Sequence, residues 1–147
     1  MDNYLENIGE RARACQYALT AVSSETKNKA LRAAAAALID NADAIIKANE
    51  KDVYASREKG VSEALIDRLV LDADRIKAMA EGLVKISELN DPVGELLEEF
   101  TRPNGLLIKK VRVPMGVIGI IYESRPNVTS DAFGLCFKSS NVSVLRG

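Results

Sequence analysis

A polar loop that follows an apolar run carries the residues best suited to chemistry. The run Val117–Tyr122 is Val-Ile-Gly-Ile-Ile-Tyr, and the loop continues Glu-Ser-Arg-Pro-Asn to Asn127. In doubly wound sheets, ligands bind beyond the carboxyl ends of the strands, so we expect a ligand at this loop. Arg125 is either a rigid fork for a phosphate or carboxylate, or else a solvated charge or the ion-pair partner of a neighbour such as Glu123. Asn127 is either the N-cap of the next helix or an amide donor to a developing oxyanion, and the spacing alone favours the cap.

Arg146 and the two cysteines are weaker candidates. Arg146 ends the last apolar run of the chain, where it either points toward a ligand or stays a surface charge. Cys136 and Cys15 fall on the apolar faces of predicted helices, where a free cysteine behaves as a small hydrophobe. The chain has neither a GxGxxG fingerprint nor a Walker loop, so a glycine loop that holds phosphate is not supported.

The composition removes several classes of mechanism and partner. The 147 residues include no histidine and two cysteines, which excludes Ser-His-Asp triads, imidazole acid-base catalysis and four-ligand zinc sites, so we expect no metal. With 20 Lys+Arg against 21 Asp+Glu and no long charged block, neither nucleic acid nor a membrane surface is an expected partner. The N-terminus has no signal-peptide core, and the longest apolar run is too short to cross a membrane. These features favour a soluble cytoplasmic protein.

Up to about residue 90, apolar residues recur every three or four positions, which predicts a series of amphipathic helices. The first helix would begin at Asp2 or Asn3 and carry an apolar stripe that includes Leu5 and Cys15. The predicted N-caps are Ser23 or Ser24, Ser62 and Asp72; Asn41 is a candidate internal cap, and Gly60 is the predicted stop of the alanine-rich stretch.

After residue 90 the pattern changes to turns and strands. Residues 91–94 and 102–105 are Pro- and Gly-containing turns, and 106–113 predicts a strand exposed on one face or at a sheet edge. The run at 117–122 is typical of a strand buried on both faces of a parallel sheet. A helix from about Val128 to Ser139 and a strand at 141–146 complete one β-α-β crossover, so the fold class is α/β with a sheet that is incomplete.

The segment Val113–Ala132 closely resembles the signature region of γ-glutamyl phosphate reductase, also called glutamate-5-semialdehyde dehydrogenase. This enzyme of proline biosynthesis belongs to the aldehyde dehydrogenase superfamily. The most specific stretch is Tyr122–Thr129, YESRPNVT. The resemblance implies three parts: a helical N-terminal segment (1–90), a turn-rich linker with an oligomerisation-type strand (91–116), and the first β-α-β of a Rossmann-type nucleotide-binding domain (117–147).

The resemblance also implies an oxidoreductase that uses NADPH to reduce γ-glutamyl 5-phosphate to glutamate 5-semialdehyde and release phosphate. A cysteine thiolate attacks the acyl phosphate, and hydride then reduces the thioacyl enzyme. Asn127 would be the oxyanion donor, and Arg146 would approach the adenosine ribose of the cofactor. The residues that would line the cofactor are Tyr122, Glu123, Ser124, Arg125 and Pro126. The sequence does not decide whether the cofactor is NADPH or NADH.

The chain also departs from the family's pattern. Family members are much longer, and this chain resembles their N-terminal portion and ends before the catalytic cysteine, so we expect no activity from it alone. The alternative is a non-catalytic product or a helical interaction and oligomerisation module. The expected partners are the small-molecule substrate, further copies of the chain and glutamate 5-kinase. Ser140 stands where the family has a glycine, which places a Cβ at a left-handed helix end.

Overall fold

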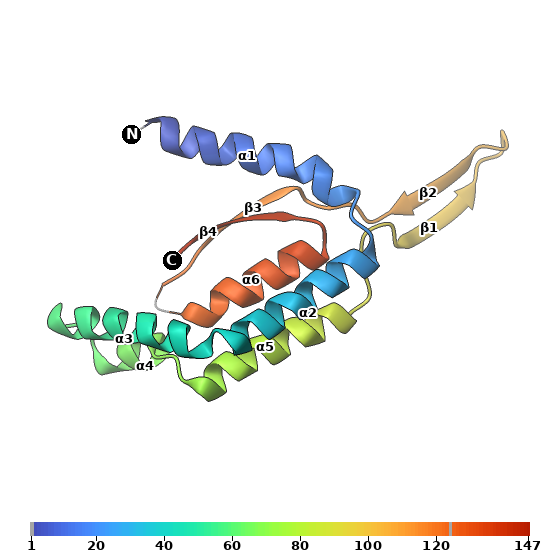
Figure 1. Cartoon of the computed structure of the whole chain (residues 1–147). Coiled ribbons are helices and arrows are strands. Elements are labelled where there is room, and N and C mark those ends of the chain that lie inside the picture. The colour runs from blue at the N-terminus through green and yellow to red at the C-terminus, as the bar shows by residue number, and fades with distance from the viewer. Residues whose placement is uncertain (1, 124) are drawn as a thin grey trace.

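The computed structural model describes residues 2–123 and 125–147, which form a mixed α/β fold (Figure 1). Five helices come first: α1 (Asp2–Thr20), α2 (Ser24–Asp40), α3 (Ala42–Glu58), α4 (Glu63–Leu69) and α5 (Ala73–Glu88). They are followed by β1 (Leu96–Thr101), β2 (Leu107–Val111), β3 (Val117–Ile121), α6 (Pro126–Lys138) and β4 (Val142–Arg146).

The helix boundaries follow the capping residues. The Ser23 hydroxyl accepts a hydrogen bond from the Thr26 amide at 3.2 Å, and the Asp72 carboxylate accepts one from the Arg75 amide at 2.7 Å. Gly60 has φ of +72° just beyond α3, a backbone conformation that glycine adopts without steric cost. The N-caps predicted at Ser23 and Asp72 and the stop at Gly60 are therefore confirmed.

The main apolar core lies between α2, α5 and α6. Buried residues from α2 and α5 form its centre, and the partly buried rings of Phe133 and Phe137 from α6 pack against them. Gly134 faces the same contact: a Cβ there would lie 2.8 Å from Leu83 Cδ2 and 2.9 Å from Ile86 Cδ1. The missing side chain thus lets α6 approach α5 closely.

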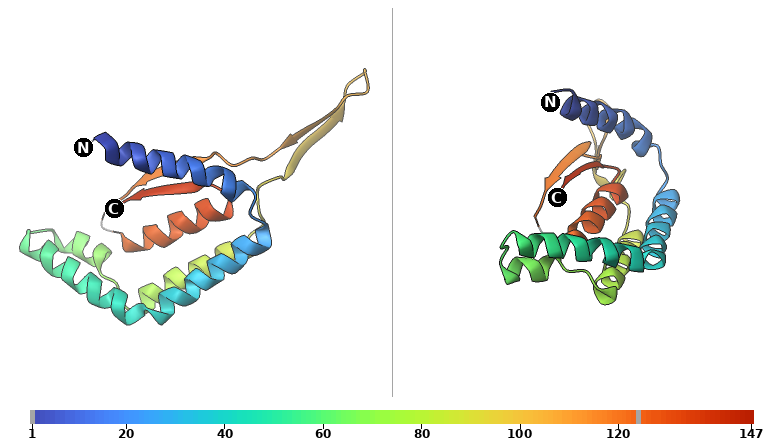
Figure 2. Two further views of the ribbon diagram at one scale, coloured as in Figure 1. Left: turned by 45° about the horizontal axis from the view of Figure 1, so that its top comes forward. Right: turned by 60° about the vertical axis from the view of Figure 1, so that its left-hand side comes forward.

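β3 and β4 form the predicted parallel pair, with α6 as the crossover. The register runs from Val117 opposite Val142 to Ile121 opposite Arg146. In Figures 1 and 2 the pair lies between α1 on one face and α6 on the other. The expectation of a strand buried on both faces is wrong, since Ile121 is 86% exposed. The reason is that α1 packs mainly over β4, and among the described residues β3 has only one neighbouring strand.

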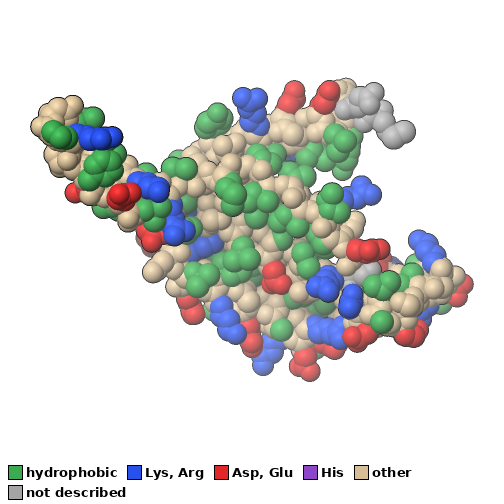
Figure 3. Space-filling view, turned by 180° about the vertical axis from the view of Figure 1, so that it is seen from behind, with side chains coloured by type: hydrophobic (Ala, Val, Ile, Leu, Met, Phe, Trp, Pro, Cys, Tyr) green, Lys and Arg blue, Asp and Glu red, His purple; other side chains and the backbone are tan. Residues whose placement is uncertain are grey.

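β1 and β2 form an antiparallel hairpin that projects away from the helices (Figure 2). The strand expected at 106–113 is present as β2, but β1 was not predicted. All six residues of β1 are exposed, and apolar side chains lie along the arm (Figure 3). The Lys109 ammonium pairs with the Glu99 carboxylate across the strands at 3.0 Å.

Helix α1 is only partly buried. Ala12 is 6% exposed, whereas Leu5 is 73% exposed and Cys15 is also exposed. The expectation that Cys15 lies buried on an apolar face is therefore wrong, because much of α1 has no packing partner among the described residues. No helix within 2–123 and 125–147 is long and apolar enough to cross a membrane.

Two lysines are buried where α2, the end of α6 and the turn after α5 meet. Lys27 is 1% exposed, and its ammonium donates to the Lys138 carbonyl at 3.1 Å and the Ser140 hydroxyl at 3.0 Å. The same ammonium forms an ion pair with Asp91. Lys138 is 3% exposed and donates to the Ser87 carbonyl at 3.1 Å. This network ties three distant parts of the chain together.

The end of α6 is a left-handed turn. Ser140 has φ of +55°, and the Asn141 amide donates to the Cys136 carbonyl at 2.8 Å, the long-range bond of a Schellman motif. The predicted left-handed conformation at Ser140 is confirmed. Its hydroxyl compensates part of the strain by accepting the hydrogen bond from Lys27.

Candidate functional site

The first turn of α6 differs from the expected one. Arg125 occupies the N-cap position, Pro126 lies in the first turn and Asn127 is already helical. The alternative that Asn127 caps the helix is therefore wrong. Proline explains the earlier start, because its φ is fixed near the helical value and no N–H is lost at that position.

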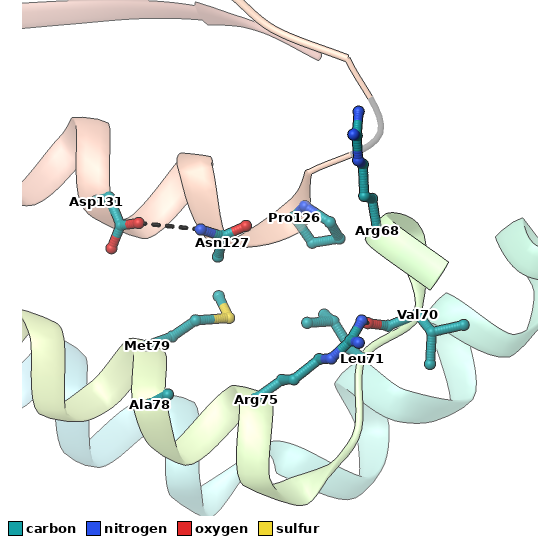
Figure 4. Close-up of a pocket in the computed structure, with 9 residues that line it drawn as sticks. All are labelled: Arg68, Val70, Leu71, Arg75, Ala78, Met79, Pro126, Asn127 and Asp131. Atoms are coloured by element: carbon teal, nitrogen blue, oxygen red, sulfur yellow. Dashed lines mark hydrogen bonds between the residues drawn. The ribbon is translucent and has the colours of Figure 1, made fainter. Parts of the chain in front are cut away.

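The Asn127 side chain is held within the helix. Its Nδ2 donates to Asp131 Oδ2 at 3.1 Å, one turn further along α6 (Figure 4). A carboxylate oxygen only accepts, so this contact requires the amide nitrogen rather than the amide oxygen on the side of Asp131. One N–H of Asn127 is used by Asp131, and the second is available.

Tyr122 is fixed between β4 and α6. Its amide donates to the Arg146 carbonyl at 3.0 Å, which extends the strand pair by one step. The Tyr122 hydroxyl shares a 2.5 Å hydrogen bond with the Thr129 hydroxyl on α6. The ring lies against Gly147, where a Cβ would be 3.2 Å from the Tyr122 Cε2. Tyr122, the first residue of the loop, is thus held by hydrogen bonds to both β4 and α6.

The other loop residues present charge to solvent. Glu123, Arg125 and Arg146 are exposed, and none of the ion pairs within 2–123 and 125–147 includes them. The proposed pairing of Arg125 with Glu123 is therefore absent. Ser124, also expected to line a cofactor, lies outside the described residues. No described side chain caps the N-terminus of α6, where the helix dipole leaves a partial positive charge.

A cavity of about 350 Å³ lies between the α4–α5 region and the first turns of α6 (Figure 4). Pro126 and Asn127, which the sequence predicted at the functional site, both line this cavity. The other lining residues are Arg68, Val70, Leu71, Arg75, Ala78, Met79 and Asp131. Tyr122, Glu123, Arg125 and Arg146 do not line it. The expected site residues thus divide into one group at the strand ends and one group at this cavity.

Sequence reasoning missed the charged residues of the cavity. Arg75 is committed to structure: one Nη donates to the Val70 carbonyl at 2.8 Å and to the Asp67 carbonyl, and the other pairs with the Asp67 carboxylate at 3.0 Å. Arg68 takes part in none of the ion pairs among the described residues, and its guanidinium points past Pro126, away from Asn127 and Asp131 (Figure 4). The signal that would have found Asp131 is its spacing of four residues from Asn127.

Neither cysteine is arranged as a nucleophile. Cys136 is 6% exposed, and burial raises the pKa of its thiol, which keeps it protonated. This confirms the structural role expected for Cys136. Cys15 is exposed on α1, and neither sulfur lines the cavity that contains Asn127.

Comparisons with known proteins give one consistent result, although no family model matches the chain. The chain is 52% identical over 147 residues to the γ-glutamyl phosphate reductase of Clostridium novyi, covering 100% of this chain and 35% of that protein. The protein of the same name from Caldanaerobacter subterraneus is 54% identical over 143 residues, which is 97% of this chain and 34% of that one.

Two solved structures are also similar. The crystal structure of γ-glutamyl phosphate reductase from Thermotoga maritima matches with a TM-score of 0.91 and 43% identity, over 94% of this chain and 33% of that one. The enzyme of that name from Saccharomyces cerevisiae matches with a TM-score of 0.91 and 34% identity, over 96% and 36% of the two chains. The chain spans about a third of the length of these relatives.

Proposed function

Because the chain is a homologue of γ-glutamyl phosphate reductase over about a third of that enzyme's length, we propose that it contributes the cofactor-lining loop and the oxyanion donor of such a reductase. The reaction is the NADPH-dependent reduction of γ-glutamyl 5-phosphate to glutamate 5-semialdehyde with release of phosphate, a step of proline biosynthesis. The observation that carries the proposal is the 52% identity over all 147 residues to a reductase of that name.

The strand ends are suited to the anionic cofactor. Arg125 and Arg146 are exposed and outside the ion pairs of the described residues, and the N-terminus of α6 has no side-chain cap among them. Guanidinium forks and open helix N–H groups both favour phosphate. The anchored Tyr122 fixes the main chain beside them. When bound, NADPH supplies the hydride, and the residues of this chain bind and orient it.

Asn127 is suited to stabilise charge on the acyl oxygen. Asp131 holds one N–H of its amide, which leaves the other N–H in a fixed orientation at the cavity. A donor that is already oriented costs no reorganisation when the oxyanion forms, and such a donor contributes about 10²–10³ in kcat. Asp131 is thus a positioning residue for Asn127.

The proposal assigns the nucleophile to a residue other than Cys15 and Cys136. A buried, protonated thiol at Cys136 is a poor nucleophile, and Cys15 does not line the cavity that contains Asn127. We therefore expect the 147-residue chain to show no turnover by itself when NADPH absorbance is followed with γ-glutamyl phosphate generated in situ.

The proposal is tested by exchanging the matching segment of the Thermotoga maritima reductase for this chain. The chimera should oxidise NADPH in the presence of γ-glutamyl phosphate, and Asn127→Ala should lower its kcat by about 10²–10³ with a smaller change in KM. Asn104→Ala, in the hairpin turn, is the matched control and should leave kcat unchanged. A folded chimera without activity, or an Asn127→Ala chimera with unaltered kcat, contradicts the proposal.

A second candidate function is self-association through the β1–β2 hairpin. The observation that favours it is the set of exposed apolar residues along the arm, among them Leu97, Phe100 and Leu107, beside strand edges that no other described strand covers. In this proposal residues 91–116 form an oligomerisation element next to a helical segment (1–90) and the first β-α-β of the nucleotide-binding domain (117–147). Glutamate 5-kinase as a partner, a cytoplasmic location and the preference for NADPH stay predictions.

A further inference from the structure

We propose that the outer face of α2 and α5 binds the same face of a second copy of the chain, with the two copies related by a two-fold axis and their α5 helices antiparallel. The two helices lie side by side (Figures 1 and 2), and no residue of α6 lines the groove on this face. The proposal does not depend on the reductase reaction, and it concerns a different surface from the β1–β2 hairpin.

The groove between α2 and α5 has an apolar lining and a volume of about 740 Å³. Three small residues line it, Ala35, Ala36 and Ala80, and two larger apolar side chains beside them reach solvent. These are Ile39, which is 48% exposed, and Val84, which is 36% exposed. An exposed apolar surface that charged residues surround is typical of a surface that binds another protein.

The charged residues of α5 indicate which protein would bind there. Four of them line the groove with alternating sign: Lys77, Glu81, Lys85 and Glu88. In an antiparallel pair of α5 helices, Lys77 faces Glu88 of the second copy and Glu81 faces Lys85 of the second copy, with both pairings centred at residues 82–83. A parallel pair in register would instead place like charges opposite each other. The pattern is thus complementary to itself in one orientation, as a two-fold interface requires.

Helix α2 has nearly the same centre. The Arg32 Nε donates to the Ser87 hydroxyl at 3.2 Å, which places these two residues at the same level of the antiparallel helices (Figure 2). Because both helices rise about 1.5 Å per residue, Ala35 and Ala36 are level with residues 83–84 of α5. The same axis would therefore bring the alanines of the two α2 helices together, where their small side chains permit a close approach.

The α5 charges are available to a second copy. Lys85 and Glu88 take part in none of the ion pairs within 2–123 and 125–147, and the Lys77 ammonium lies 4.0 Å from the Glu81 carboxylate. Lys77 and Glu88 are eleven residues apart, which is about 16 Å along one helix. These two side chains can therefore pair only between copies, so an exchange of their charges tests the contact directly.

Sedimentation velocity of the Phe100→Glu chain measures this contact without the one proposed for the hairpin. At about 100 µM this chain should form a dimer, with twice the 16.0 kDa mass of one copy. Lys77→Glu and Glu88→Lys, each added singly, should raise the Kd of the dimer at least about tenfold, because each places like charges opposite each other twice. An equimolar mixture of the two variants should recover the dimer, since every facing pair in the mixed dimer again has opposite signs.

Lys51→Glu and Glu58→Lys, at exposed positions on α3, change the net charge by the same amounts and are the matched controls. Each should stay dimeric in the Phe100→Glu background. The inference is overturned by a monomeric Phe100→Glu chain at about 100 µM, by single variants at Lys77 and Glu88 that stay dimeric, by a mixture that stays monomeric, or by control variants that dissociate. The reductase proposal is tested separately by the activity of the chimera, so either can fail alone.

Discussion

At the scale of single residues, the least expected feature is the buried pair of lysines with one nearby carboxylate. Burial alone would raise the pKa of Asp91, but hydrogen bonds from Lys27, Ser24 and the Val93 amide outweigh it and hold the pKa below its usual value. Burial, followed by the charges of Lys27 and Arg32, lowers the pKa of Lys138 despite the attraction of Asp91. The ionised Asp91 is therefore needed to keep two ammonium groups inside the fold.

Because of this network, the free energy of unfolding should decrease at acidic pH. A carboxyl group whose pKa is lower in the folded state stabilises the fold above its unfolded pKa of about 3.8, and that stabilisation is lost as the pH falls through the folded value. Asp91→Asn should cost about 3 kcal/mol at neutral pH, because it leaves Lys27 buried without its counter-charge. The difference from the unsubstituted chain should shrink below about pH 4.

Urea unfolding between about pH 7 and pH 2.5 measures this effect. Asp52→Asn, at an exposed position on α3, is the control and should follow the unsubstituted chain at every pH. A constant difference between Asp91→Asn and the unsubstituted chain across the whole range would contradict the role given to Asp91.

The spacing of the two lysines places them on the buried faces of their helices, but periodicity alone does not predict that a lysine there is buried. Lys27 lies one turn before Leu31 on the apolar stripe of α2, and Lys138 lies one turn after Gly134 on the buried face of α6. A lysine in such a position usually extends a solvated stem at the edge of a core. The burial of Lys27 depends on Asp91 and on the Lys138 carbonyl at the end of α6, which come from distant parts of the chain.

At the scale of elements, the contact between α5 and α6 depends on Gly134. Gly134→Ala should destabilise the protein by about 1–3 kcal/mol, because the new Cβ would lie within 3 Å of two core side chains. Gly9→Ala is a matched control in α1, where a Cβ would meet nothing within 4 Å, and it should stabilise by about 0.5–1 kcal/mol. Thermal unfolding of both variants measures the difference. The same sign of change in both would contradict the packing argument.

The hairpin makes a prediction about assembly. Phe100→Glu should shift the chain to a lower molar mass in light scattering, because it places a charge on the exposed apolar arm proposed to bind a second copy. Tyr54→Glu, at a 68% exposed aromatic on α3, should leave the mass unchanged. A monomeric unsubstituted chain at micromolar concentration, or the same mass for all three proteins, would rule out this role of the hairpin.

The elements were predictable where local chemistry decides them. Ser23 and Asp72 cap their helices, and the parallel crossover follows from an apolar run, a helix and a second run. β1 was missed because Glu98 and Glu99 interrupt the alternation, although across the hairpin they face Lys110 and Lys109. The exposure of Ile121 was missed because burial depends on how many strands and helices surround β3, which its own residues do not determine.

At the scale of the whole molecule, the predicted site residues occupy two regions. Tyr122 and Arg146 adjoin at the carboxyl ends of the strands, whereas Pro126 and Asn127 line the cavity toward α4 and α5. The loop could be predicted as a site from its place after a strand. The cavity could not, because it requires α4 and α5 to lie beside α6.

Under the proposed function, the strand-end region binds the cofactor and Asn127 in the first turn of α6 binds the acyl oxygen, so the nicotinamide and the acyl group would have to meet beside this helix start. The division of the chain into residues 1–90, 91–116 and 117–147 stays a prediction.

A fluorescence titration of the 147-residue chain with NADPH tests whether β3, α6 and β4 form a nucleotide site. We expect saturable binding that Arg146→Ala weakens at least about tenfold, since a guanidinium paired with phosphate or ribose oxygens forms charge-assisted hydrogen bonds. Arg102→Ala, in the hairpin, should bind like the unsubstituted chain. No saturable binding, or equal affinity for NADPH in the Arg146→Ala and unsubstituted chains, would contradict the assignment of a nucleotide site to these elements.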